Sequence, residues 1–286
     1  MRLVALGFLA SGASAKPSNA FFAMDTIARG GPDVVPALLA ELGYDGIGGK
    51  ALDVAMPPAM RAQKLKFYNG YLTLTVTPAS VVPDEKLRAW FAAMKGYDTA
   101  LWLAIKSVAR PDGTSWANSA AEADEVVVAH LRRLAGAAAP HGVRLALYPH
   151  AAQWLERVED AIRVVGKVDR ANVGLTFNLA HWLRVEGDQR DPRPVLKAAL
   201  PRLMFVTING ADAGETKTMA WTRLIQPLDA GTYDVAKFVR LLGEVKYTGP
   251  VGFQGYGIKA EPRGILERSM IAWKGFAPGG DRSDGK

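Results

Sequence analysis

Two histidines and several neutral polar residues each follow an apolar run of strand type. The segment 175–182 reads LTFNLAHW, in which a strand-like run ends at Asn178 and is followed three residues later by His181. A second run ends at Tyr148, two residues before His150. Imidazole titrates near neutral pH and can act as a general base, whereas amides and phenols offer hydrogen bonds without charge. These residue types predict a site that holds hydroxyl groups and moves a proton.

The rest of the composition excludes several other kinds of site. The chain has 286 residues with four histidines and no cysteine, so disulfides, thiolate nucleophiles and zinc–thiolate centres are excluded. His130 lies in a helical pattern and His141 in a turn between Pro140 and Gly142, so we expect both at the surface. The net charge of +7 comes mostly from scattered basic residues, which indicates a solvated surface and no nucleic-acid partner.

Apolar runs of strand type alternate with helical patterns from residue 20 onward. The expected strands are 21–24, 44–48, 66–76, 100–105, 143–147, 173–177, 203–208 and 251–253, and the expected helices are 33–42, 58–64, 85–94, 118–139 (capped by Asn118), 156–168, 192–199, 233–242 and 261–273. Strands that alternate with helices imply a parallel sheet with right-handed crossovers. Eight such units predict an α/β fold, a single (β/α)8 TIM barrel over residues 16–276. An open doubly wound sheet is the alternative, but no G-x-G-x-x-G follows the first strand and no P-loop is present.

In a TIM barrel, the catalytic groups lie at the carboxyl ends of the strands. The residues expected there are Asp25, Lys50, Tyr71, Lys106, Tyr148, His150, Asn178, His181, Asn209, Gln254 and Tyr256. Many of these side chains are neutral donors and acceptors, which suit the hydroxyl groups of a small carbohydrate or cyclitol. Trp102, Trp154 and Trp182 either stack on such a ligand or fill the core. No phosphate-cradling motif is present, so we expect an unphosphorylated ligand.

Four segments resemble the xylose-isomerase-like TIM barrels, a family that includes sugar phosphate isomerases and epimerases. The segments are GVRLALYPH, NVGLTFNLAHW, QPLDAGTYD and YTGPVGFQGYG. QPLDAGTYD, which resembles the family's turn before its seventh helix, is the most specific of them. The resemblance runs from Asn19 to Trp273 and is strongest from Gly142 to Tyr256.

The resemblance also implies where a metal would be held. Members of the family commonly bind a divalent metal through glutamate, aspartate, histidine and glutamate at the ends of strands five to eight. The matching positions in this chain hold Tyr148, Asn178, Thr207 and Gln254. A divalent cation needs anionic oxygens or several imidazoles to replace its hydration shell, so we expect no metal at these positions. The resemblance also implies two histidines beside the ligands on strands five and six, and this chain retains them as His150 and His181. A divalent metal held by Asp25 and these two histidines is the alternative.

The reaction that the resemblance implies is removal of a proton next to a sugar carbonyl, leading to isomerisation, epimerisation or elimination. This chemistry needs a base and a group that stabilises the enolate oxygen. We expect His150 to be the base and Lys106 to replace the metal's charge, with Asp25 or His181 as the second acid or base. The residues expected to bind the substrate are Tyr148, Asn178, Asn209, Gln254, Tyr256, Lys50 and Tyr71.

Other interpretations stay open at this point. The chain could be a non-catalytic sugar-binding barrel that lost its chemistry with its metal site. Asn178 could cap its loop, and His181 could be a core histidine bonded to backbone. The DNA-repair endonuclease branch of the same fold depends on a multi-zinc cluster, which two histidines and neutral ligand positions cannot build.

The N-terminus reads MRLVALGFLASGASAKP, in which a charge, a short apolar stretch and small residues follow one another. This pattern predicts a signal peptide over residues 1–15, cleaved after Ala15, and a periplasmic or secreted protein. A buried first strand is the alternative. No run is long enough to span a bilayer, so we expect no membrane insertion of the mature chain. The tail at 277–286 has no apolar anchor, and we expect it to be disordered.

Overall fold

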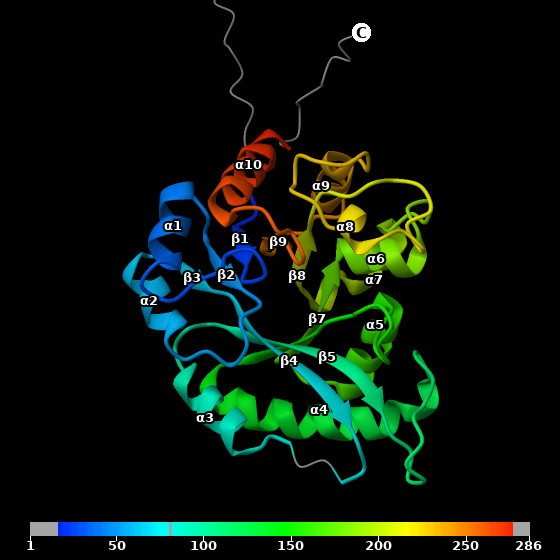
Figure 1. Cartoon of the computed structure of the whole chain (residues 1–286). Helices are drawn as coiled ribbons and strands as arrows, with labels where there is room; N and C mark the ends of the chain where they lie inside the picture. Colours follow the sequence, from blue (N-terminus) through cyan, green and yellow to red (C-terminus); the bar gives the residue numbers. More distant parts are fainter. Residues whose placement is uncertain (1–16, 80–81, 277–286) are drawn as a thin grey trace, which may run out of the picture.

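A computed structural model describes residues 17–79 and 82–276, which form an all-parallel barrel surrounded by helices (Figure 1). The strands are β1 Phe21–Met24, β2 Gly46–Gly48, β3 Lys66–Phe67, β4 Asn69–Val76, β5 Ala100–Val108, β6 Arg144–Leu147, β7 Val173–Asn178, β8 Leu203–Ile208 and β9 Val251–Phe253. Their order in the sheet is β3-β2-β1-β9-β8-β7-β6-β5-β4. The expected signal peptide and disordered tail lie outside the described residues.

The sheet closes through the segment that holds β3 and β4. Only Tyr68 separates these two strands, so residues 66–76 act as one long strand. Its first part pairs with β2 and its second part with β5. The nine strands therefore occupy eight positions around the barrel, and the predicted TIM barrel is confirmed.

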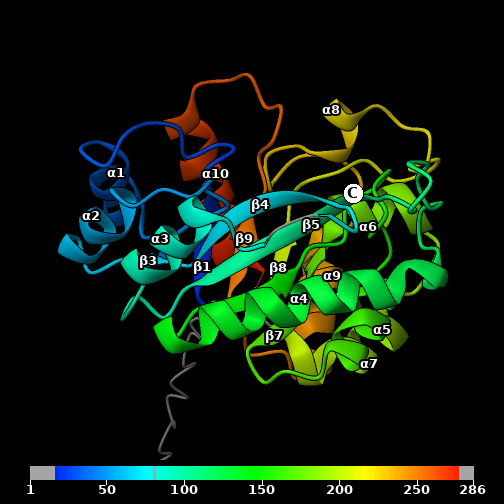
Figure 2. The ribbon, with the colours of Figure 1, turned by 90° about the horizontal axis from the view of Figure 1, so that it is seen from below.

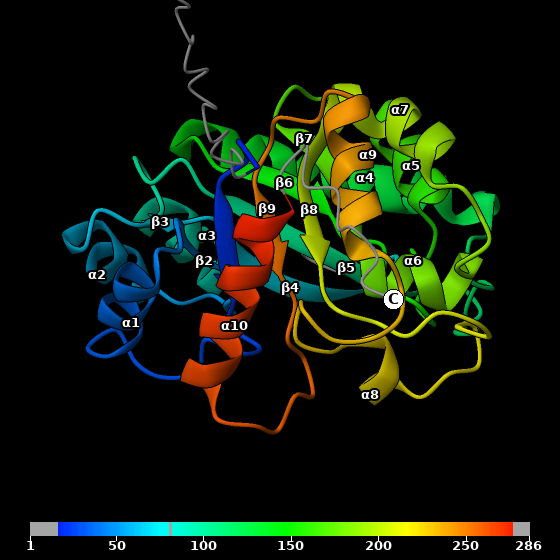
Figure 3. The ribbon, with the colours of Figure 1, turned by 90° about the horizontal axis from the view of Figure 1, so that it is seen from above.

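Helices connect the strands and lie outside the barrel, with α1 and α2 on one side and α5 and α7 on the other (Figures 2 and 3). They are α1 Val35–Leu42, α2 Met56–Ala62, α3 Glu85–Ala93, α4 Asp124–Ala138, α5 Val158–Val168, α6 Leu179–Glu186, α7 Arg193–Ala199, α8 Trp221–Leu224, α9 Val235–Glu244 and α10 Pro262–Gly275. Within the described ranges, no helix is long and apolar enough to cross a bilayer.

Aromatic side chains fill the interior of the barrel. Trp102 is fully buried there, stacked on Tyr148 at 5.2 Å between ring centroids and edge-on to Phe205 at 5.3 Å. Glycine leaves room for the ring of Phe22, because a Cβ at Gly252 would lie 2.4 Å from it. The packed interior leaves a ligand no room inside the barrel, so the predicted site lies at the rim where the strands end.

Two helical expectations are wrong. Asn118 does not cap α4, which begins at Asp124 after a short 3-10 turn, and its amide instead lies 3.5 Å from the Glu156 carboxylate. His130 is not at the surface: α4 buries it, with Nδ1 2.7 Å from the Val126 carbonyl oxygen. A helical pattern locates a helix, but the turn that precedes it and the helix packed over it decide the cap and the buried face.

Candidate functional site

Four consecutive strands bring the four neutral residues of the family's metal positions to one end of the barrel. Tyr148 follows β6, Asn178 ends β7, Thr207 lies in β8 and Gln254 follows β9, and all four are buried. Asn178 pairs with Thr207 in the sheet register, so their side chains lie on neighbouring strands at the same height. The strand ends therefore gather these four side chains at one end of the barrel.

Asn178 connects two parts of this site. Its Nδ2 donates to the Tyr148 hydroxyl at 2.7 Å, and its Oδ1 accepts from the His181 backbone N–H at 3.1 Å. The second bond caps the N-terminus of α6, because a side-chain oxygen satisfies an otherwise unpaired helix N–H. One amide thus orients a phenol and starts the helix that carries His181.

The two retained histidines lie against each other at the rim. Their ring centroids are 4.0 Å apart. His150 Nδ1 lies 2.9 Å from the Ala151 carbonyl oxygen, which can only accept, so this nitrogen carries the proton and Nε2 has the free lone pair. His181 Nδ1 accepts from the Ala151 N–H at 3.4 Å, so its proton lies on Nε2. The backbone of one residue therefore fixes opposite tautomers on the two rings.

Burial keeps both imidazoles neutral. It lowers the pKa of His150, with a smaller opposing effect from the bond to Ala151. The pKa of His181 is lowered further, first by complete burial and then by electrostatic interaction with His150 and Arg184. His150 Nε2 is therefore an unprotonated base at neutral pH.

Asp25 lies on the other side of the rim, directly after β1. Burial raises the pKa of Asp25 to about 6, although nearby Lys50 and the Thr26 backbone N–H lower it. Lys50 continues the strand pairing through a bridge to Gly70. A carboxyl group that titrates near pH 6 can both give and accept a proton under physiological conditions.

Of the other expected site residues, some contact the residues described above and others bond elsewhere or lie exposed. Tyr71 meets Tyr148 edge-on at 5.6 Å, and the Gln254 carbonyl accepts from the Thr26 hydroxyl at 2.9 Å. Asn209 instead donates to the backbone of its own loop, at 2.6 Å from the Leu224 oxygen. Lys106 is exposed at the end of β5, and Tyr256 is 65% exposed.

The structure adds two residues to the site, Trp221 and Arg184, that no sequence pattern had selected. Trp221, in α8, meets the His181 ring edge-on at 5.6 Å, and the Arg184 guanidinium lies 4.5 Å above the indole. The only signal in the sequence was a tryptophan in the segment between an expected strand and the next expected helix, where helix α8 was not expected. Trp221 therefore contacts His181 from outside the strands.

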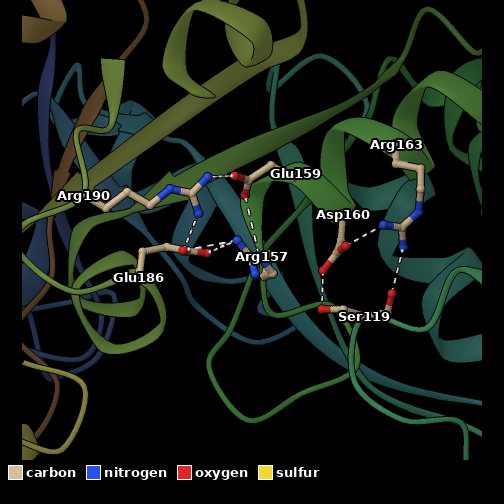
Figure 4. A network of polar contacts seen from close by, with 7 residues as sticks. All are labelled: Ser119, Arg157, Glu159, Asp160, Arg163, Glu186 and Arg190. Carbon is tan, nitrogen blue, oxygen red and sulfur yellow. Dashed lines mark hydrogen bonds and ion pairs between the residues drawn. The ribbon is translucent and has the colours of Figure 1, made fainter. Parts of the chain in front are cut away.

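An ion-pair network holds α6 in place (Figure 4). Glu186, in the last turn of α6, is bound by Arg157 at 3.0 Å between Nη2 and Oε1, and also by Arg190. Arg190 reaches Glu159 as well, which ties α6 to the first turn of α5. The network and the Asn178 cap thus fix the two ends of the helix that carries His181.

Comparison with known proteins shows which protein family and which individual proteins this chain resembles. A family model described as xylose isomerase-like TIM barrel matches residues 36–273. A 3-dehydroshikimate dehydratase from Pseudomonas aeruginosa is 29% identical over 138 residues, which are 46% of this chain and 21% of the relative. This chain therefore matches about a fifth of that relative's length.

Solved structures share the fold at low identity. D-Allulose 3-epimerase from Methylomonas sp. is 17% identical with a TM-score of 0.68, and the match covers 92% of this chain and 99% of the epimerase. IOLI protein, solved with a bound zinc atom, is 16% identical with a TM-score of 0.68, over 90% of this chain and 96% of that one.

The donor set of this chain does not fit such a zinc. Within residues 17–79 and 82–276, no three His, Cys, Asp or Glu side chains are grouped to hold a metal ion. Burial raises the pKa of Tyr148 well above its usual value, so the phenol stays protonated and its oxygen is occupied by Asn178. The four neutral positions offer dipoles where a divalent cation needs anionic oxygens.

Proposed function

The chain belongs to the xylose isomerase-like TIM barrel family, and we propose that it moves a proton at a carbon next to the carbonyl of a sugar or cyclitol without a resident divalent metal. The matched solved structures include a sugar epimerase of the same fold. The neutral rim supports the absence of a metal, because its residues bind hydroxyl groups better than cations.

One observation carries this proposal: the two titratable groups suited to proton transfer lie on opposite sides of the barrel. Asp25 follows β1 and His150 follows the β6 strand, and these strands are four positions apart in either direction around the eight-position ring. A substrate on the barrel axis would have one group on each face. A two-base epimerisation requires this arrangement, since the proton leaves one face and another is added to the opposite face.

The steps balance with these two groups. His150 Nε2 takes the proton from the carbon, and the C–H electrons form an enolate whose oxygen gains negative charge. Lys106 and Lys50 are the cations available to stabilise that oxygen. Protonated Asp25 then gives its proton to the opposite face, and solvent exchange restores both groups. The Tyr148 hydroxyl, which accepts from Asn178, still has its proton to donate to a substrate hydroxyl group, and the Thr207 hydroxyl, which has no partner within the ranges that the structure describes, binds another.

Elimination is the second candidate, and the match to a dehydratase favours it. It begins with the same proton removal, but the enolate then expels a neighbouring hydroxyl group instead of regaining a proton. In that case Asp25 protonates the leaving hydroxyl group, which departs as water. Both reactions share the first step, so they are distinguished by the product: an epimer in one case and a dehydrated compound in the other.

Deuterium exchange tests the proposal. The purified protein is incubated in heavy water with free and oxidised monosaccharides and with cyclitols, and the recovered ligand is analysed by mass spectrometry and NMR. We expect deuterium next to the carbonyl, and its loss with His150→Gln but not with His141→Gln, since His141 lies in the turn before β6. Asp25→Asn should keep this exchange but lose the epimerised or dehydrated product, because the second protonation is then missing. A ligand that binds without exchange identifies a binding protein. Stoichiometric manganese, zinc or cobalt in the active protein would refute metal independence.

A further inference from the structure

A second hollow lies at the opposite end of the barrel from the proposed active site. Its volume is about 340 Å³, within the range of small-molecule pockets. Its walls come from the amino ends of the strands: Ala20 precedes β1, Asp45 precedes β2 and Lys66 begins β3. Arg61 of α2 and Tyr97, before β5, complete the wall.

Positive charge dominates this hollow. Arg61, Lys64 and Lys66 line it against a single carboxylate, Asp45. That carboxylate is already used, because its Oδ2 accepts from the Phe21 backbone N–H at 2.7 Å. Lys66 pairs with Asp98 at 2.5 Å, outside the lining. A small anion in the hollow would therefore meet a net positive field.

Two donors of the lining have no partner among the described residues. The Lys64 ammonium makes no hydrogen bond or ion pair there, and neither does the Tyr68 hydroxyl. Tyr68 is almost wholly buried, with its ring stacked on Phe22 at 4.6 Å between centroids. Burial, with a smaller effect from Asp45, raises the pKa of Tyr68, so the hydroxyl keeps its proton and can donate.

Two contacts fix the position of the Arg61 guanidinium in the lining of the hollow. It lies 3.9 Å from the centroid of the Tyr97 ring and donates from Nη2 to the Gly96 oxygen at 2.7 Å. Both contacts fix its plane, while its other N–H groups stay available for an anionic oxygen.

We propose that this hollow is a second ligand site, which binds a small molecule through a phosphate or carboxylate group held by Arg61, Lys64 and Tyr68. The site lies at the amino ends of the strands, so it is separate from the proposed proton-transfer site at their carboxyl ends. A ligand there adds no group to the proposed chemistry.

The chain provides a matched pair of variants for the test. Lys64 follows α2 and Lys246 follows α9, and both have left-handed backbone, with φ of 60° and 62°. Each donates its N–H to the carbonyl three residues earlier, at 2.9 Å. Lys64→Gly and Lys246→Gly therefore remove the same charge and relieve the same backbone strain, but only the first changes the hollow.

Calorimetric titration of the full chain with inorganic phosphate and, separately, with acetate at low ionic strength gives the readout. We expect saturable binding of at least one anion at one site, about tenfold weaker in Lys64→Gly and in Arg61→Gln, which corresponds to ~1.4 kcal/mol. Lys246→Gly should bind like the unmodified protein. Phosphate binding alone points to a phosphate ester as ligand, and acetate binding to a carboxylate. Equal weakening by both lysine variants, or no saturable binding of either anion, would overturn the proposal.

Discussion

Replacing Asn178 with alanine should destabilise the protein by more than the loss of a helix cap. The substitution removes the cap of α6 and leaves the buried Tyr148 hydroxyl without its partner. A cap contributes about 1 kcal/mol. A buried donor or acceptor left unpaired costs ~1–3 kcal/mol. We therefore expect Asn178→Ala to lower the free energy of unfolding in urea by about 2–4 kcal/mol. Asp234→Ala is the matched control, since Asp234 caps α9 at the surface and should cost only about 1 kcal/mol.

A double-mutant cycle isolates the bond between the two side chains. Tyr148→Phe removes the hydroxyl and keeps the ring that stacks on Trp102. If the bond stabilises the fold, the double variant should lose less stability than the sum of the two single variants, by about 1 kcal/mol. Strict additivity, or a loss in Asn178→Ala no larger than in Asp234→Ala, would refute the reasoning.

Three further predictions use other parts of the molecule. Asp25→Asn should stabilise the protein at pH 8 by up to about 3 kcal/mol in urea unfolding and change little below pH 4, because the folded-state pKa of Asp25 is raised to about 6 and its ionisation opposes folding above that pH. Equal effects at both pH values would contradict this sign. Glu186→Gln should lower the free energy of unfolding by about 1–2 kcal/mol, because Arg157 and Arg190 lose their shared carboxylate, and it should also lower the deuterium-exchange activity. Unchanged stability would show that the network does not anchor α6. If residues 1–15 are a signal peptide, the protein purified from a secreting host should lack them, as measured by intact-mass spectrometry. A retained Met1 would contradict this prediction.

The fold could be predicted because its signal repeats along the chain. Each unit has an apolar strand and an amphipathic helix, and both periods follow from how side chains project from the backbone. The elements that the pattern missed, α6 and α8, are short and lie in loops at the rim. Helix α6 follows its strand without any turn, so its first residues read as a continuation of the apolar run ending at Asn178.

The location of the candidate site followed from the fold, but its internal contacts did not. The carboxyl ends of parallel strands meet at one end of a barrel, which was enough to bring Tyr148, Asn178 and the two histidines together. The tautomers of His150 and His181 depend on the Ala151 peptide group, which no residue type reveals. Trp221 reaches the site from a separate segment, so only tertiary structure shows it.

Neutral groups at Tyr148, Asn178, Thr207 and Gln254 remove the electrostatic repulsion that carboxylates at these positions would cause in the absence of a ligand. Carboxylates gathered at a narrow rim repel one another unless a cation lies between them, whereas an amide and a phenol can pair directly, as Asn178 and Tyr148 do. Thr207 is the exception, because its buried hydroxyl has no hydrogen-bond partner in the described part of the chain. A substrate hydroxyl would satisfy it, so substrate binding should depend on Thr207. Proton transfer should then depend on Asp25, whose pKa is raised to about 6, and on His150, which burial keeps unprotonated at neutral pH.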